Sequence, residues 1–447
     1  MGKQRGAADI ADETMSKNKF TTDHFLLILL TVTAFVPGIS LRITTFGFTW
    51  TVYRAAVFLA LFFVVAGAVP IRIGDHSLLH KWILFMLFWL CYGFALLFLG
   101  RYSDRHNGLL ELLSVFGGAV VFYVMRHILA DTKNRKTAIT LIYWMLNLMI
   151  LFGLIEIAAG KHLSTSGFND PGSSLYELVN RRQATGLMYN MNDFSAMITC
   201  MCPVLLYRGL GLKRAPTMLG VLLINLANDA TTCTLSILVF VGFYFLIIMG
   251  GRKRSAVVYK MIFWFLFIAA LAFVVFFPHE SIGGIGFFGA LSRQISNFRS
   301  GSGSLYHRVL IYGETIRAWL STGMLGMGPA GFSRYFSLYQ SQTGLVNPHS
   351  LLFEILSQYG ILVAGGFVFM LIRSYFAGRE LYRAKDKLEQ SAGLILMAYV
   401  IVYFFASFAP SSFIKYPYQW LLLSVMCSFP DNIETDVPTE RKAGDAI

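Results

Sequence analysis

One histidine and a series of arginines are the residues of this chain whose types and spacing could do chemistry. His349 stands in the tetrapeptide Asn347-Pro348-His349-Ser350, at the end of a long polar stretch. The tetrapeptide predicts a helix start with Asn347 as the cap and Pro348 in the first helical position, because apolar residues follow. The dipole of that helix would disfavour an imidazolium, so we expect a neutral His349 that can accept a proton. A purely structural or interfacial histidine is the alternative.

Arginines accompany this histidine throughout the polar stretch 278–349, where Arg308 and Arg317 stand among apolar residues at roughly helical spacing. The spacing predicts an amphipathic helix on the membrane surface, with both arginines at the level of the lipid headgroups. Arginine suits a pyrophosphate because its planar guanidinium makes paired hydrogen bonds and stays charged. Anchoring to anionic lipids is the alternative for each arginine.

A second polar stretch, 160–192, combines basic residues with a glycine and two asparagines. It contains Arg181 and Arg182, and later Asn190 and Asn192 just before an apolar run. Basic side chains, with backbone that can approach closely, suit a phosphate or a sugar. The alternative is a polar loop followed by a helix that is capped at Asn192.

Three ionisable residues stand close to the ends of apolar runs. They are Arg54, Glu156 and Glu354. Ionisable groups at membrane depth are costly and often functional, although groups near an interface can extend towards water. We expect Arg54 to belong to the site and the two glutamates to be structural partners.

Composition places the chain among integral membrane proteins. Of its 447 residues, 56% are hydrophobic and only 14% are charged. A net charge of +13 would suggest nucleic acid binding in a soluble protein, but here the basic residues cluster between apolar runs. We therefore expect no nucleic acid partner. The 5 cysteines lie in apolar segments and indicate neither a disulfide framework nor a zinc site.

Sequence signatures of nucleotide and metal enzymes are missing from the chain. It contains no GxxxxGK[ST], GxSxG or HExxH sequence and no outward acidic pair of the DxD type. A nucleotide-sugar donor is therefore not expected. We also expect no metal and no cofactor.

The apolar runs predict an all-α, polytopic membrane protein with about twelve spans, at roughly 20 residues a span. The expected spans are 23–40, 50–70, 82–99, 109–130, 138–159, 193–207, 217–229, 232–250, 258–277, 350–372, 392–410 and 416–430. The apolar stretch 216–250 is divided in two, with a turn at 228–232, because both its flanks are basic. The tails 1–22 and 431–447 would be cytoplasmic, in agreement with the positive-inside rule. In the single transmembrane domain 23–430, the outer loops 160–192 and 278–349 would form the site.

Several motifs follow one another in an order that resembles a known family. They are the segments from Glu156 to Leu163, from Arg182 to Asn192, from Ser304 to Arg308 with Trp319, from Gly326 to Gly328, and from Asn347 to Gly360. Together they resemble the O-antigen ligase and polysaccharide polymerase superfamily of bacterial membrane glycosyltransferases over residues 150–420. The sequence around His349 is most similar to the branch that includes teichuronic acid biosynthesis proteins. The family usually has asparagine where this chain has Ser350.

The resemblance implies a GT-C-like fold and a metal-independent, inverting transfer on the extracytoplasmic face of the bacterial cytoplasmic membrane. The donor would be an oligosaccharide on undecaprenyl pyrophosphate, and the acceptor another glycan or a lipid. His349 would be the general base. The resemblance assigns the pyrophosphate to arginines, here Arg182 or Arg181 with Arg308, and Arg54, expected in the site from its position in the second span, would join them. The residues expected to bind acceptor or sugar are Asn190, Asn192, Asn347 and Ser350.

Two further questions stay open at the level of the sequence. A polymerase and a ligase share these motifs, and the partners implied are membrane lipids, a flippase and a chain-length regulator. A different class of protein, a non-enzymatic flippase or exporter, would bind the same lipid-linked anion and move it. The chain shows no convincing inverted repeat of the kind that many transporters have, which disfavours this alternative.

Overall fold

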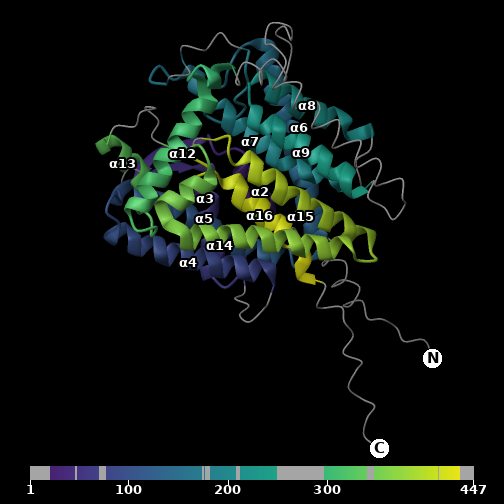
Figure 1. Cartoon of the computed structure of the whole chain (residues 1–447). Coiled ribbons are helices and arrows are strands. Elements are labelled where there is room, and N and C mark those ends of the chain that lie inside the picture. Colours follow the sequence, from purple (N-terminus) through teal and green to yellow (C-terminus); the bar gives the residue numbers. More distant parts are fainter. Residues whose placement is uncertain are drawn as a thin grey trace, which may run out of the picture.

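A computed structural model describes most of the chain as a bundle of helices with one small β-hairpin (Figure 1). The described residues are 21–45, 48–69, 77–173, 176, 182–207, 212–248, 296–339, 347–410 and 412–432. The α-helices of the first half are α2 (Thr22–Ala34), α3 (Val52–Val65), α4 (Leu78–Leu99), α5 (Arg105–Ile128), α6 (Thr132–Ala159), α7 (Met191–Met201) and α8 (Ala215–Ala227). Those of the second half are α9 (Thr231–Ile248), α12 (Gly303–Ser321), α13 (Gly331–Tyr339), α14 (Leu351–Tyr382), α15 (Lys387–Ala406) and α16 (Pro417–Cys427).

Five of these helices are long and apolar enough to cross a membrane. They are α4, α5, α6, α14 and most of α15. Helices α2, α3, α8 and α9 are also apolar but shorter. The chain is therefore an all-α membrane protein, and helices occupy every expected span except 258–277, which lies outside the described residues. The count of twelve crossings remains a prediction.

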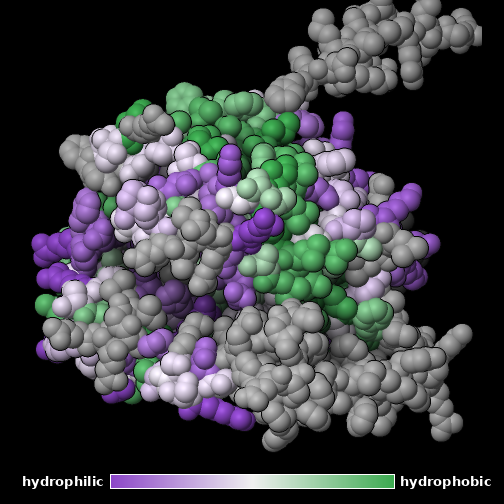
Figure 2. All heavy atoms as spheres, turned by 90° about the horizontal axis from the view of Figure 1, so that it is seen from above, coloured by the Kyte–Doolittle hydropathy of each residue, from purple (hydrophilic) through white to green (hydrophobic). Residues whose placement is uncertain are grey.

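The surface agrees with this membrane assignment. Figure 2 shows a broad hydrophobic area on one face, with hydrophilic residues on either side of it. Large apolar side chains that are exposed include Phe62, Leu99, Trp144 and Phe369. Apolar exposure on this scale is unfavourable in water and is suited to contact with lipid.

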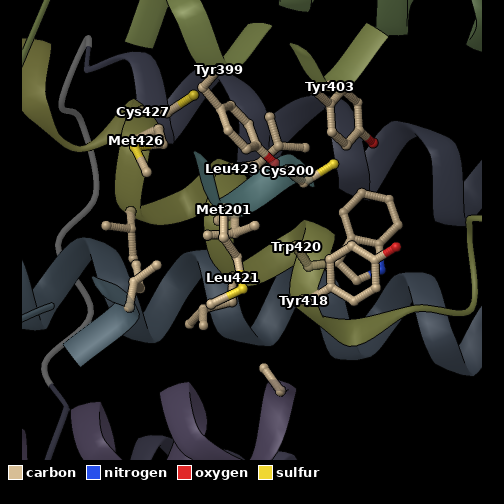
Figure 3. Packing of buried hydrophobic residues seen from close by; sticks show 14 of the residues in the cluster. Cys200, Met201, Tyr399, Tyr403, Tyr418, Trp420, Leu421, Leu423, Met426 and Cys427 are labelled. Carbon is tan, nitrogen blue, oxygen red and sulfur yellow. The ribbon is translucent and has the colours of Figure 1, made fainter. Parts of the chain in front are cut away.

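Helix α15 occupies the middle of the bundle and contacts α9, α14 and α16. Its residues Tyr399 and Tyr403 are fully buried, close to Cys200 of α7 and to Tyr418 and Trp420 of α16 (Figure 3). Lipid is as apolar as these side chains, so close packing and internal hydrogen bonds hold such a bundle together. The helices α12 and α13 lie together at one end of it (Figure 1).

The turn expected at 228–232 is confirmed, because α8 ends at Ala227 and α9 begins at Thr231. Two predicted helix starts are wrong. Helix α7 is capped by Asn190, whose side-chain oxygen accepts a hydrogen bond of 2.8 Å from the backbone of Asn192, so Asn192 itself lies in the first turn.

Helix α14 begins after His349 and not before it. Its cap is Ser350, and His349 has a φ of 50°, a left-handed conformation that cannot continue from a helical Pro348. The prediction of Asn347 as the cap, with His349 in the first turn, is therefore wrong. A neutral His349 requires another cause than the helix dipole.

The β-hairpin was not expected from the sequence. Strands β1 (Ser40–Thr45) and β2 (Phe48–Thr51) pair antiparallel, with Ser40 opposite Thr51 and Thr45 opposite Phe48. Threonine, isoleucine and aromatic residues favour such pairing. The expected span 50–70 thus begins as a strand, and its helix α3 starts at Val52.

Gly360 interrupts the helical conformation of α14 and allows a second segment to pack against it. Its φ of 72° and ψ of −173° are accessible almost only to glycine. A β-carbon at this position would lie 2.4 Å from the carbonyl oxygen of Leu325. The loop between α12 and α13 is thereby held against the middle of α14.

We expect Gly360→Ala to lower the free energy of unfolding by about 2 kcal/mol or more, from backbone strain and overpacking. Gly365→Ala on the same helix is the matched control, since no atom lies within 4 Å of a β-carbon there. The control should be neutral or slightly stabilising because alanine favours helix. Thermal unfolding of the purified proteins in detergent measures both, and equal midpoints would contradict the strain argument.

Candidate functional site

Arg308 is the centre of the most distinctive polar arrangement in the described structure. It projects from α12 and donates hydrogen bonds to the carbonyl oxygens of Phe408, at 2.6 Å, and Ala409, at 3.3 Å, in the turn after α15. It also contacts the hydroxyl of Thr232, at 3.5 Å, in the first turn of α9. One half-buried guanidinium thus joins three segments that are far apart in the sequence. A cation is favoured here because the carbonyl end of a helix carries partial negative charge.

His349 belongs to the same place. Burial of the ring, and secondly the charge of Arg308, lower the pKa of His349 from its ordinary value to about 4. Its own carbonyl oxygen accepts a hydrogen bond of 3.4 Å from the hydroxyl of Tyr312, one turn along α12 from Arg308. The imidazole is therefore neutral at physiological pH, as expected from the sequence, but for a different reason.

Within the part of the chain that the structure describes, no carboxylate neutralises the positive charge of Arg308. Among the described residues, its hydrogen bonds go to two carbonyl oxygens and a hydroxyl, and no Asp or Glu lies within ion-pair distance of it. A half-buried cation of this kind is costly unless an anion approaches it. The geometry therefore offers an anion-binding position beside a neutral base.

The turn 228–232 connects Arg308 to the segment that carries Arg182. Asn228 is fully buried and bonds both backbone groups of Ala184: its oxygen accepts from the amide at 2.7 Å, and its nitrogen donates to the carbonyl at 2.8 Å. The same side-chain nitrogen donates to the hydroxyl of Ser195 on α7, at 3.0 Å. The turn 228–232 thus contacts Ala184 through Asn228 and Arg308 through Thr232.

Glu156 fixes the other half of that segment. Its carboxylate accepts hydrogen bonds from the amides of Thr185, at 2.9 Å, and Gly186, at 2.7 Å, and from the Thr185 hydroxyl at 2.9 Å. It also bonds the ring of His162, at 2.8 Å. Glu156 is buried, and every hydrogen bond that it makes holds neighbouring protein groups in place. This supports the expectation that its role is structural.

Among the described residues, the remaining site candidates of the stretch 160–192 are not hydrogen-bonded to Arg308. Arg182 is exposed and follows directly on to the fixed backbone of residues 183–186, whereas Arg181 lies outside the described residues. In the described part of the chain, no hydrogen bond or ion pair joins Arg182 to Arg308 or His349. Asn190 acts as the cap of α7, and Asn192 lies half-buried beside it.

Arg54 lies in a different pocket, on α3. This apolar pocket has a volume of about 140 Å³ and is lined mainly by residues of α3 and α5, including Val57, Phe58 and Phe116. Arg54 and Lys415 are the cations in its wall. Arg54 also donates a hydrogen bond to the carbonyl of Thr49. The structure therefore groups Arg54 with Lys415 and not with Arg308.

A second, polar pocket of about 90 Å³ lies next to the His349 segment. Asn347 and Pro348 are in its wall, with Glu111, Glu354 and the same Lys415. Ser350 is not in that wall; its buried hydroxyl has no hydrogen-bond partner in the described residues. The two pockets thus share Lys415, which the sequence interpretation had missed.

Glu354 has the structural role that the sequence suggested. Its carboxylate accepts from the Ser412 hydroxyl and from the amides of Phe413, at 3.0 Å, and Ile414, at 3.5 Å. These bonds fix the segment that leads to Lys415. Glu111 was missed as well, although an ionisable residue within an expected span is a signal that could have found it.

These positions form a coherent chemical arrangement. Arg308 can bind an anion, His349 can accept a proton, and a polar pocket with amide, carboxylate and ammonium groups adjoins the His349 segment. Displacement of an anionic leaving group by a deprotonated nucleophile needs these elements. In the described residues there is no group of three or more His, Cys, Asp or Glu that could hold a metal.

Glu156→Gln should loosen the Arg182 segment, because an amide cannot accept all the hydrogen bonds that this carboxylate accepts from backbone and side chains. We expect a loss of about 2 kcal/mol in stability and faster trypsin cleavage at Arg182. Limited proteolysis with mass spectrometry of the fragments measures the cleavage. Glu380→Gln, at an exposed position near the end of α14, is the control and should behave as wild type. Equal cleavage rates in all three proteins would contradict the role given to Glu156.

No protein-family model and no curated protein matches this chain.

Proposed function

We propose that this protein is a membrane glycosyltransferase that transfers a glycan from undecaprenyl pyrophosphate to a hydroxyl of a glycan or lipid acceptor. It would be a polymerase or a ligase of the O-antigen ligase type, with a GT-C-like arrangement of about twelve spans. The proposed setting is the extracytoplasmic face of a bacterial cytoplasmic membrane, in the biosynthesis of a surface polysaccharide. A flippase that supplies the donor and a chain-length regulator are its proposed partners.

The observation that carries the proposal is the pairing of Arg308 with His349. Arg308 is a half-buried cation held by carbonyl oxygens, without a carboxylate among the described residues, and His349 beside it has a pKa of about 4. A pyrophosphate would supply the negative charge that Arg308 lacks, and an acceptor hydroxyl would supply the proton that His349 can accept. A purely structural role would not require an arginine without a carboxylate partner beside a half-buried, neutral histidine.

The proposed reaction is a single displacement. The acceptor oxygen forms a bond to the anomeric carbon while the bond from that carbon to the pyrophosphate oxygen breaks, which inverts the anomeric centre. The electron pair leaves with the pyrophosphate, whose developing charge Arg308 and Arg182 stabilise, and the proton of the acceptor passes to the free ring nitrogen of His349. Arginines take the role that a divalent cation has in other transferases because their charge is permanent.

The apolar pocket suits the lipid part of such a donor or an accompanying anionic lipid. Its wall is mostly apolar, and the cations Arg54 and Lys415 could lie near phosphate charge. In this proposal Arg54 acts on the lipid side of the substrate, while Arg308 and Arg182 act on the pyrophosphate that leaves. Asn347 and Ser350 remain the candidates on the acceptor side.

An in vitro transfer assay tests the proposal directly. Purified protein is incubated with a synthetic undecaprenyl-pyrophosphate oligosaccharide in the presence of EDTA, and the products are separated by size. We expect transfer by wild type, with losses of at least a hundredfold for His349→Ala and Arg308→Ala, since a general base and a charge stabiliser each contribute about that much. A ladder of products would indicate a polymerase, and transfer only to an added second acceptor a ligase.

Two variants separate chemistry from folding in this assay. Arg317→Ala removes an exposed arginine of the same helix α12, and His24→Ala removes a histidine that bonds Thr21 at the start of α2. Both should retain activity. Inactivity of wild type with every acceptor, together with lipid-linked units trapped inside cells that lack the protein, would support a carrier and refute the transferase.

The pH dependence of kcat/KM provides a second test. The pKa of His349 in the free protein is about 4, below its ordinary value, because of burial and then Arg308. The base is thus neutral above that pH and becomes protonated as the pH falls through it. We expect kcat/KM to stay constant from pH 7 to about 5 and to fall with a midpoint near 4.

Recovery of activity after return to pH 7 must accompany each acidic point, so that unfolding is not mistaken for titration. A midpoint between 6 and 7 would mean that His349 is hydrated and distant from Arg308, or that another group is the base. Either result would contradict the arrangement on which the mechanism depends.

A further inference from the structure

The polar pocket contains a buried acceptor that no described residue satisfies. Gln358 is 3% exposed and lines the pocket, and its side-chain oxygen has no hydrogen-bond partner among the described residues. Its amide nitrogen has a partner, because Gln358 hydrogen-bonds the carboxylate of Glu111. That bond fixes the orientation of the amide. A buried oxygen without a donor is costly, so the pocket is suited to a ligand that supplies an O–H or N–H group.

The carboxylates in the wall do not themselves call for a cation. Glu111 accepts a hydrogen bond of 2.7 Å from the hydroxyl of Tyr359 as well as that of Gln358, and Glu354 accepts its bonds from residues 412–414. The third carboxylate of the wall, Asp104, accepts from the backbone of residues 106–107 and from the side chain of Asn107. Lys415 lies in the same wall and is exposed. The wall thus combines fixed acceptors with an exposed ammonium donor. A neutral ligand with several hydroxyl groups matches it better than an ion does.

The size of the pocket limits the ligand. A cavity needs about 10–15 Å³ to hold one water molecule, and this one has about 90 Å³. It therefore has room for several waters, or for the hydroxyl-bearing atoms of one sugar ring. The side chain of Phe332 forms an apolar part of the wall, and aromatic and apolar surface commonly completes such a ligand site.

The position of the pocket relates it to the proposed base. Asn347 and Pro348 line it, and the next residue of the chain, His349, follows directly outside its wall. Another part of the wall comes from α13, where Ser333 is exposed. The pocket is therefore open to a glycan that extends beyond one ring.

We propose that this pocket binds the sugar residue that carries the acceptor hydroxyl, with the side-chain oxygen of Gln358 accepting a hydrogen bond from that sugar. The inference rests on the proposed transferase function and goes beyond it in naming the acceptor subsite. Under this inference the acceptor is a glycan, and not a lipid that carries no sugar. Asn347 and Lys415 are the further polar groups that face the ring.

Steady-state kinetics with purified full-length protein tests the role of Gln358. Gln358→Met keeps the length of the side chain but removes the acceptor oxygen, together with the amide nitrogen that bonds Glu111. We expect KM for the acceptor to rise about tenfold, as for one lost hydrogen bond, with KM for the lipid-linked donor unchanged and kcat within about twofold. Gln390→Met, the same substitution at the start of α15, is the control and should leave all three constants unchanged.

Cysteine protection gives a readout that does not depend on turnover. In a background with the exposed Cys91 replaced by serine, Ser333→Cys is labelled with a hydrophilic maleimide. The probe ligand is the oligosaccharide released by mild acid from the lipid-linked glycans of cells that carry His349→Ala. It should slow labelling at least fivefold, whereas maltotriose should not. Ser337→Cys, one turn further along α13 and outside the pocket wall, should be labelled at the same rate with or without the oligosaccharide.

The outcomes separate the two proposals. If wild type transfers glycan but Gln358→Met keeps its acceptor KM and Ser333→Cys is not protected, the acceptor subsite is elsewhere and the transferase function stands. If cells with His349→Ala accumulate no lipid-linked glycan and wild type transfers none, the transferase function fails and the subsite fails with it. A rise in donor KM instead of acceptor KM would assign the pocket to the donor and overturn the inference.

Discussion

The architecture of the site depends on one constraint: irregular backbone at the end of an apolar bundle must find hydrogen-bond partners within the protein. Four side chains supply those partners. Glu156 bonds the amides of residues 185–186, Asn228 bonds both backbone groups of Ala184, Glu354 bonds the amides of residues 413–414, and Arg308 bonds the carbonyl groups of residues 408–409. Each of them stands at or near a helix terminus, so rigid helices determine where the loops lie. The positions of Arg182, His349 and Lys415 follow from these bonds.

Arg308 differs from the other three because its supporting bonds leave its charge in place. The partners of Glu156 are amides, a hydroxyl and the ring of His162, which disperse the charge of a carboxylate. The partners of Arg308 are carbonyl oxygens, which orient a guanidinium without neutralising it. Burial, and secondly this same charge, lower the pKa of the neighbouring imidazole of His349 and keep it neutral. Structural support and a positive potential beside a base therefore come from one side chain, and replacing it by lysine would lose the paired geometry.

Apolar periodicity predicted the helices of this protein well, and the turn at 228–232 followed from the basic flanks of one long apolar stretch. Local conformation was harder to predict. Asn347 and Pro348 are favourable residues for a helix start, but the left-handed His349 places the cap at Ser350. The β-hairpin occupies the expected link between two membrane segments and the first residues of the second, and Arg54 beside it belongs to the apolar pocket and not to the group around Arg308. Pairing across the fold, such as Gln358 with Glu111, has no signal in one sequence.

Lys415 provides a physical reason why the two pockets can serve different parts of one reaction. It is exposed in the wall of both, with the apolar pocket and Arg54 on one side and the carboxylates Glu111 and Glu354 on the other. The cations and apolar residues of the first pocket favour a lipid with negative charge, whereas the second, with the unsatisfied side-chain oxygen of Gln358 in its wall, favours a ligand that supplies hydroxyl groups. A lipid-linked donor and a neutral sugar would thus be sorted to opposite sides of Lys415. His349, which follows the wall of the polar pocket and faces Arg308, then stands where the sorted substrates would meet.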